Sequence, residues 1–444
     1  MILVIILLVI LLGIGGTFAY LYVETDIFKS DKEILIEKLS ELISGESNFI
    51  DTNLKNYTEK KKQSAYENSG NLTLDVQIPE EVVENTDDVN NISVNFSGKT
   101  NQAERQIEQN IEIDYGKEDL AFSINYKQDK DTYGIQSDYI GAKYTAMTNT
   151  EVQNLDEENL VALSEFKNKM EIIKNFKFSK EEVEQIKNTY LKILEEQNAD
   201  EKFSSYDIST GKSYQLTLTG EEYKNILLKF LEIFKQDTTL QNKIKTIFDG
   251  EISSNKIDEM IENIKNSEVK EFQLTIETTD KMLTGFILQI DDNIITLRKQ
   301  TINDQLEYQF EIQMVQKSMQ QDEMKIKIGV TSKYNGLQTL DIIDENHNFV
   351  LEASDHEQIM SYNYNIINKI KFNNSISIER LNSENSIFLD DYDETSRQNY
   401  LDKVQERIKQ VNQNHIENSG LVVDRLGVPH KSARGRHLKY KMLE

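Results

Sequence analysis

The chain has 444 residues, which predicts two or three domains because a single domain averages about 150 residues. Its 76 acidic residues outnumber the 50 basic ones and give a formal net charge of −26, so it lacks the basic surface that nucleic-acid phosphates require, and we expect no nucleic-acid partner. With no cysteine and five histidines, the composition excludes disulfides, thiolate zinc sites and cysteine nucleophiles.

An uncharged apolar segment opens the chain. Residues 1–23 carry no charged side chain, and the first one is Glu24. As an α-helix with a rise of ~1.5 Å per residue, residues 2–23 extend about 33 Å, which matches the roughly 30 Å hydrocarbon core of a bilayer. Tyr20 and Tyr22 lie where an aromatic belt would contact lipid headgroups. We therefore predict a transmembrane anchor over 1–23 that contacts the membrane through residues 2–23.

A cleaved signal peptide is the alternative interpretation of this segment. Residues 17–19 place small side chains as a cleavage site requires, but the apolar run exceeds the ~7 to 15 residues of a signal peptide and no positive charge precedes it. Lys29, Lys32 and Lys38 come after the segment, which by the positive-inside rule favours a cytoplasmic body. Acidic residues are interspersed with these lysines, and an N-terminal anchor with a short lead commonly exports the rest of its chain. We expect a single-pass cell-membrane protein whose bulk is extracytoplasmic.

The segment 24–69 is predicted to form a juxtamembrane helix and a linker. Apolar residues at helical spacing predict a short amphipathic helix over about 31–45 that continues as a stalk, and these residues are Ile34, Leu35, Leu39, Leu42 and Ile43. Residues 46–70 are polar and indicate a linker or a poorly packed helix.

The segment 70–202 is predicted to be a β-meander followed by helices. Between 71 and 147, apolar and polar residues alternate in short runs separated by Asn, Asp and Gly, which is typical of antiparallel strands with one wet face. From 152 to 202 the apolar period becomes helical, and Ser179 with Glu182 forms a capping box for the second helix there.

The segment 203–392 repeats this pattern. A hairpin over 206–220 precedes a strongly apolar helix over 221–235, and a second long run of strands covers 269–380. Residues 393–444 are typical of a polar C-terminal helix and a basic tail. The chain thus predicts an α+β fold with an N-terminal transmembrane helix followed by two units of antiparallel β-sheet packed with helices.

The helix over 221–235 is the candidate binding element, because it is apolar over more than half of its circumference. One interpretation is a core helix that lies on a sheet. The other is a helix that lines a cavity or docks a partner, with a candidate face for an apolar ligand or partner formed by Tyr223, Ile226, Leu227, Phe230, Leu231 and Phe234.

Motifs for catalysis, cofactors and metals are weak in this chain. Residues 211–213 read Gly-Lys-Ser, but Tyr206 stands where a phosphate-binding loop needs glycine, so a hairpin turn is the better interpretation. His347 and His356 lie among acidic residues at a spacing that matches no zinc motif, which favours surface loops. We predict no catalytic, cofactor-binding or metal-binding residues and no cofactor.

The sequence after the predicted anchor carries a resemblance. YVETDIFKSDKEILIEKLSELI, residues 22–43, resembles uncharacterised single-pass membrane-anchored proteins of clostridia and related Gram-positive bacteria, in which a TDxFKSDK stretch comes directly after the anchor. That family has no assigned activity, so the resemblance implies no catalytic residue. The alternation of long sheets with helices is also similar to lipoprotein-carrier folds, in which a curved sheet and helices enclose an apolar cavity; this likeness implies architecture only.

We therefore expect a membrane-anchored cell-envelope protein with a non-enzymatic binding or scaffolding ectodomain, whose partner is an apolar ligand or an envelope protein. The alternative is an envelope hydrolase that uses carboxylates, and a third interpretation is a structural or sensory ectodomain without ligand. Binding predicts a continuous apolar cavity of several hundred Å³. Hydrolysis predicts convergent carboxylates with shifted pKa values in a polar cleft, and a structural ectodomain predicts neither.

Overall fold

The computed structural model describes much of the chain between residues 29 and 419, namely 29–44, 49–77, 92–115, 120–137, 140–148, 178–197, 199–245, 253–317, 323–355 and 358–419. The predicted anchor over 1–23, the first helix predicted after 152 and the basic tail lie outside these ranges. Within them, no helix has both the length and the apolar run that a bilayer crossing needs.

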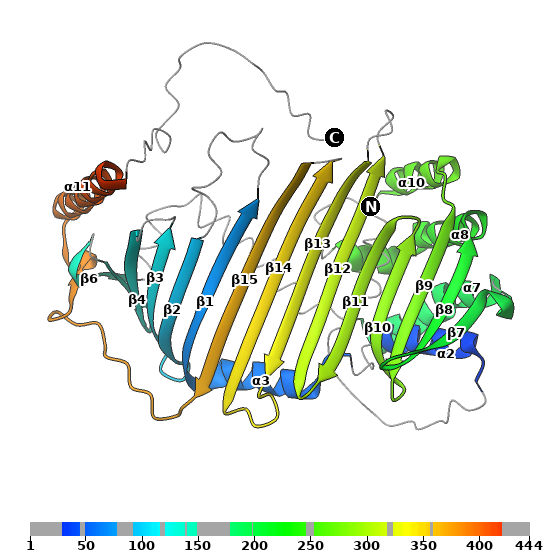
Figure 1. The fold of residues 1–444 in the computed structure, drawn as a ribbon, viewed down its shortest axis with the longest axis horizontal. Helices are drawn as coiled ribbons and strands as arrows, with labels where there is room; N and C mark the ends of the chain where they lie inside the picture. Colours follow the sequence, from blue (N-terminus) through cyan, green and yellow to red (C-terminus); the bar gives the residue numbers. More distant parts are fainter. Residues whose placement is uncertain are drawn as a thin grey trace, which may run out of the picture.

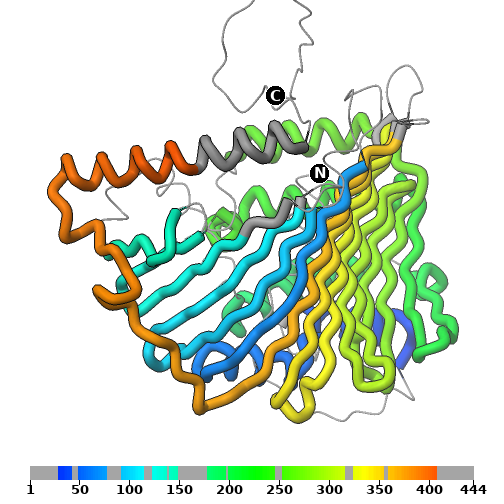
Figure 2. Tube along the Cα trace, turned by 60° about the vertical axis from the view of Figure 1, so that its left-hand side comes forward, coloured from blue at the N-terminus to red at the C-terminus, as the bar shows by residue number. Residues whose placement is uncertain are grey.

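One curved sheet dominates the structure (Figures 1 and 2). The sixteen strands of the described residues pair in the order β16-β6-β5-β4-β3-β2-β1-β15-β14-β13-β12-β11-β10-β9-β8-β7. All neighbours are antiparallel except β16 and β6, which are parallel. The strands are β1 (Ala65–Gln77), β2 (Ile92–Asn101), β3 (Gln106–Tyr115), β4 (Leu120–Asp129), β5 (Thr132–Ser137), β6 (Gly141–Thr148), β7 (Phe203–Ile208), β8 (Gly211–Thr219), β9 (Glu271–Thr279), β10 (Met282–Ile290), β11 (Asn293–Ile302), β12 (Gln305–Lys317), β13 (Glu323–Asn335), β14 (Ile342–Asp355), β15 (Gln358–Phe372) and β16 (Ser386–Phe388).

The predicted mixture of helices and antiparallel sheet is confirmed, but the prediction of two separate sheets is wrong. Strand β1 pairs with β2 on one side and with β15 on the other, in a ladder that runs from Tyr66 and Phe372 to Gln77 and Ser361. This ladder joins the two predicted runs of strands into one sheet. Alternation along a strand assigns each residue to a face, but it does not reveal which strand lies beside it.

The helices of the described residues lie mainly on the inner side of the curve (Figures 1 and 2). Helices α2, α7, α8 and α10 gather at the β7 end of the sheet, α3 crosses beneath the middle strands, and α11 begins near β6 (Figure 1). The helices are α2 (Asp31–Ser44), α3 (Thr52–Gln63), α6 (Lys180–Ile186), α7 (Lys192–Gln197), α8 (Gly220–Gln236), α9 (Thr238–Lys245), α10 (Ser254–Asn266) and α11 (Glu394–Ser419).

Two helices begin where the sequence predicts them. Ser179 accepts a hydrogen bond from the backbone of Glu182 at the start of α6, which confirms the predicted capping box. A second capping box, formed by Thr219 and Glu222, starts α8, which corresponds to the predicted helix over 221–235. Because each box satisfies backbone N–H groups that a helix start leaves unpaired, these helices have well-defined beginnings.

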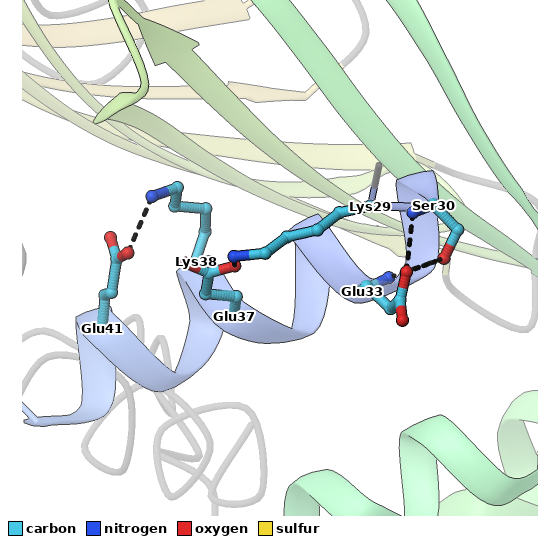
Figure 3. Close-up of polar contacts among 6 residues, drawn as sticks. All are labelled: Lys29, Ser30, Glu33, Glu37, Lys38 and Glu41. Atoms are coloured by element: carbon cyan, nitrogen blue, oxygen red, sulfur yellow. Dashed lines mark hydrogen bonds and ion pairs between the residues drawn. The ribbon is translucent and has the colours of Figure 1, made fainter. Parts of the chain in front are cut away.

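Helix α2 confirms the predicted amphipathic helix, but it is part of the core and not a stalk. Leu35 and Leu39 are 0% and 1% exposed, and α2 packs against β7, β8 and β9. Its polar side carries local contacts, which Figure 3 shows: Ser30 and Glu33 cap the helix start, and the Nζ atom of Lys29 lies 2.7 Å from an oxygen of Glu37. The prediction of a stalk is wrong because the apolar side of the helix faces the sheet.

The region predicted as a linker is also structured. Helix α3 begins after Asp51, whose side chain accepts a hydrogen bond from the backbone of Asn53, and Tyr57 on this helix is 2% exposed. Strand β1 starts at Ala65, five residues before the predicted β-segment. A helix with one buried side chain has no apolar periodicity, so its sequence resembles a linker.

Candidate functional site: the inner face of the sheet

The predicted ligand face on α8 is placed in the core of the structure. Five of its six residues are buried and Phe230 is partly exposed. Tyr223 stacks on Phe272 of β9 with 4.5 Å between ring centroids. A cavity of about 60 Å³ lies between α8, α7, α2 and the sheet and has Tyr223, Ile226, Leu227 and Phe230 in its wall. Ligand pockets usually measure ~300–1,000 Å³, so the cavity is too small for a lipid-sized ligand.

Other predicted motifs take structural roles. The Gly-Lys-Ser residues 211–213 lie in the hairpin between β7 and β8, as predicted. His347 lies within β14 and is partly buried, so the prediction of a surface loop for this residue is wrong; His356 is outside the described residues. No group of three or more His, Asp or Glu side chains in the described ranges is arranged to hold a metal ion.

The inner face of the sheet is apolar from the helix cluster to the strands beyond it. One residue from each strand between β10 and β1 shows this continuity. Each residue of this row is the direct cross-strand partner of the next, and the row begins in the buried core on β10. The row is Leu288, Ile295, Ile312, Ile328, Leu351, Tyr362 and Val76. Alternate residues of the same strands, such as Lys327, Glu352 and Asn363, lie on the outer face and are polar.

The exposure of this apolar face changes along the sheet. Under α2, α8 and α10 the inward residues are fully buried, and Leu216 and Phe286 are both 0% exposed. On β13, β14, β15, β1, β2, β3 and β4 most of the inward residues remain partly exposed, and Phe349 on β14 is 37% exposed. The exceptions include Val76 on β1, at 3% exposed, and Ile343 and Ile370, which are buried beside α3. We call the second region the open inner face, which comprises Leu72, Leu74, Val94, Phe96, Ile111, Ile113, Ile124, Ile326, Ile328, Val330, Phe349, Leu351, Ala353, Met360, Tyr362, Tyr364 and Ile366.

Charge is nearly excluded from these strands on the inner side. Apart from tyrosines, the described inward positions of β13–β15 and β1–β4 hold three ionisable residues, all on β14: Glu345 and His347 near α3, and Asp355 at the last position of the strand. The whole chain has a net charge of −26, so the open inner face contrasts with the rest of the molecule. An uncharged apolar surface of this extent marks a candidate binding region.

Helix α3 closes one end of the open inner face. Tyr57 packs with Ile343 and Ile370, which are both 0% exposed, and its ring meets Phe372 edge-on at 6.1 Å. At the β6 end of the sheet, α11 is attached by a hydrogen bond of 2.6 Å between the hydroxyls of Tyr400 and Thr145.

A buried carboxylate fixes α3 to the sheet. Glu345 is 7% exposed and accepts hydrogen bonds from the Tyr57 hydroxyl at 2.6 Å and from Nδ2 of Asn368 at 2.8 Å. Lys61 of α3 lies 3.3 Å from the same carboxylate, which balances its charge. Burial, followed by the hydrogen bond to Glu345, raises the pKa of the Tyr57 hydroxyl far above its ordinary value, so this hydroxyl stays protonated and donates.

His347 lies one inward position beyond Glu345 on the same strand. Its Nδ1 atom is 3.0 Å from the hydroxyl oxygen of Ser332, and its ring meets Tyr334 edge-on at 5.5 Å. Burial lowers the pKa of His347, so the imidazole is neutral at pH 7. In the sequence His347 resembles a surface-loop residue because it lies among Asp, Glu and Asn, although its spacing of two from Phe349 and four from Leu351 is a strand signal.

Comparison with known proteins identifies no relative of this chain. The chain matches no protein-family model, no curated protein and no solved structure. A function for this protein therefore has to be argued from the open inner face, its border at α3 and the two ionisable groups beside it.

Proposed function

We propose that this protein is a membrane-anchored, extracytoplasmic envelope protein that binds a lipid acyl chain on the open inner face. The observation that carries the proposal is the change in exposure along one apolar face. Beneath the described helices α2, α8 and α10 Phe286 is 0% exposed, and on the strands beyond these helices Phe349 is 37% exposed. Each buried methylene contributes about 0.8 kcal/mol, so an acyl chain on this face gains free energy in proportion to its length.

Two features favour an acyl chain over other occupants. The inward positions of these strands carry almost no charge, whereas a peptide or polar polymer would bring groups that need hydrogen-bond partners. A second copy of the chain would present a face with the same inward curve (Figure 2), and two such faces cannot pack flush against one another. The predicted anchor over 2–23 would also hold the protein beside a bilayer, where acyl chains are abundant.

The alternative of a carboxylate-dependent hydrolase has less support. Four described carboxyl groups have clearly shifted pKa values, and hydrogen bonds lower the pKa of each. All four lie at helix starts, and they are Glu33, Glu181, Glu222 and Asp393. For Glu222 the lowered pKa is about 2. A general acid at neutral pH needs a raised pKa instead.

A polar cleft of about 340 Å³ beside the tip of the β7–β8 hairpin also fails to provide a free catalytic carboxylate. Glu277 in this cleft accepts two hydrogen bonds from the guanidinium of Arg298, at 2.8 and 2.9 Å. A bidentate ion pair of this kind fixes the position of both groups. Glu307, the second carboxylate of the cleft, lies 3.2 Å from the Nζ atom of Lys333, so structural ion pairs account for both carboxylates.

Photo-crosslinking tests the proposal directly. The full-length chain in phospholipid nanodiscs is exposed to a fatty alcohol, whose head is uncharged, that carries a diazirine on its alkyl chain, and the labelled peptides are mapped by mass spectrometry. We expect labels on inward residues of β13–β15 and β1–β3. Labels confined to the predicted anchor, or spread equally over both faces of the sheet, would contradict the proposal.

Two neighbouring residues of β14 provide a matched pair of variants. Leu351 faces inward and Val350 faces outward, and both are partly exposed. Leu351→Gln is expected to reduce labelling severalfold because it places an amide against the acyl chain. Val350→Gln makes the same change in polarity on the outer face and should leave labelling unchanged. Equal effects of the two variants would indicate that the sheet face plays no part.

A further inference from the structure

His347 combines an apolar location with an unused hydrogen-bonding atom. It is partly buried on the inner side of β14, and its Nδ1 atom is engaged with Ser332 at 3.0 Å. In the described part of the structure its Nε2 atom has no hydrogen-bond partner. The neighbouring Glu345 differs, because both of its oxygens are occupied by Tyr57, Lys61 and Asn368.

Resting on the proposed function, we propose that His347 binds the headgroup of the ligand and that the headgroup is an uncharged, hydroxyl-bearing group such as the glycerol of a monoacylglycerol. In this arrangement the headgroup hydroxyl bonds to Nε2 of His347. The acyl chain then extends along β14 over Phe349 and Leu351 to Ala353. Six residues at ~3.3 Å each give about 20 Å, which is on the order of the length of a long acyl chain.

Charge excludes the other headgroup classes. An anionic headgroup would need a cation, and the described inward positions of β13–β15 and β1–β4 carry no lysine or arginine. Lys61 of α3 is already paired with Glu345. A cationic headgroup at His347 would need a free carboxylate beside it. The Glu345 carboxylate is fully hydrogen-bonded, and Asp355 stands at the far end of β14 from His347. A buried charge without a partner is costly, so the site selects an uncharged head.

The imidazole also explains why a hydroxyl fits better than an ester. Neutral histidine has one N–H and one acceptor nitrogen, so Nε2 donates if Nδ1 accepts from Ser332 and accepts if Nδ1 donates. A hydroxyl can donate and accept and therefore satisfies either tautomer, whereas an ester can only accept. The burial that lowers the pKa of His347 keeps it in this neutral form near pH 7.

The test compares headgroups at a constant acyl chain. The full-length chain in nanodiscs is labelled with the diazirine fatty alcohol, and labelling of the β14 peptide is competed with 1-oleoylglycerol, oleate or octadecene. We expect 1-oleoylglycerol to compete at about tenfold lower concentration than octadecene, which is the effect of one buried hydrogen bond. His347→Phe should remove this preference while octadecene competes as before, and His347→Gln should retain it within about twofold.

Asn348→Ala serves as the control, because Asn348 is the next residue on β14 and faces outward. If none of the three competitors reduces labelling of the β14 peptide in folded protein, both the proposed function and this inference are wrong. Equal competition by 1-oleoylglycerol and octadecene, with no change in His347→Phe, would overturn the headgroup assignment alone. Tighter competition by oleate would also overturn it, because it would show that the site accepts an anionic head.

Discussion

Removal of the Glu345 carboxylate is expected to release α3 from the sheet. The carboxylate accepts short hydrogen bonds from Tyr57 at 2.6 Å and Asn368 at 2.8 Å and pairs with Lys61 at 3.3 Å. A hydrogen bond to a charged group contributes about 1.5–3 kcal/mol. The Lys61 side chain is 35% exposed and can be rehydrated, so we count only the hydrogen bonds from Tyr57 and Asn368. Glu345→Ala should then cost about 4 kcal/mol and Tyr57→Phe about 2 kcal/mol.

Hydrogen exchange on α3 measures this effect without requiring global unfolding. Because 1.4 kcal/mol corresponds to a factor of ten, amides of α3 should exchange about 30-fold faster in Tyr57→Phe and several hundredfold faster in Glu345→Ala. Glu59→Ala is the control on the same helix, since its contact with Lys62 is between exposed side chains, and exchange should change by less than about twofold.

The pattern of results across these variants decides whether the reasoning holds. Unchanged exchange on α3 in Glu345→Ala would show that apolar packing around Tyr57 holds the helix and that the carboxylate does not. A uniform loss of protection over all strands would also contradict the prediction, because the effect would then be global. In either case the attachment of α3 to the sheet would need another explanation.

Three further predictions concern the core, a buried lysine and the pH dependence of stability. Phe286→Ala should cost about 3–5 kcal/mol in urea unfolding because the side chain is 0% exposed, whereas Phe349→Ala, at 37% exposed, should cost less than about 1 kcal/mol; equal losses would refute the contrast between the two regions. Lys127 is 2% exposed and pairs with the more exposed Glu108, so Lys127→Met should leave the Tm unchanged or raise it, and a large fall would show that the ion pair stabilises the fold. Burial lowers the pKa of folded His347 below its unfolded value near 6.5, so its contribution to stability is complete above about pH 6.5 and is lost as the pH falls; the urea midpoint of His347→Gln should therefore decrease less between pH 7.5 and pH 5 than that of the parent chain.

Local features of the fold are predictable from the sequence. The capping box of Ser179 and Glu182 and the strongly apolar α8 are recognisable because their signals lie within a few residues of one another. The alternation of the strands is local in the same way. The pairing of β1 with β15 is not, because it brings Tyr66 beside Phe372 and no local pattern encodes a contact across so many residues.

The candidate site is harder to predict for the same reason. Helix α3 resembles a linker in sequence, because its single buried residue, Tyr57, finds its partner Glu345 only in the tertiary structure. His347 resembles a loop residue, because its polar neighbours lie on the outer face of β14 and hide the alternation. The predicted ligand face on α8 contains the apolar residues with the strongest helical pattern, and such residues are most often buried as core.

The position of α2 limits how the proposed lipid binder could act. Since Leu35 and Leu39 are buried in the core, the body begins at α2, and residues 24–30 alone link it to the predicted anchor over 2–23. Seven residues span at most about 25 Å when fully extended. If the predicted anchor spans a membrane, a tether of this length would keep the body beside that membrane and favour local exchange of a ligand over transport across an envelope. The short tether therefore favours exchange of the ligand with the adjacent bilayer, and the uncharged headgroup proposed for His347 is consistent with such exchange, because no charge has to leave water when the lipid moves between membrane and protein.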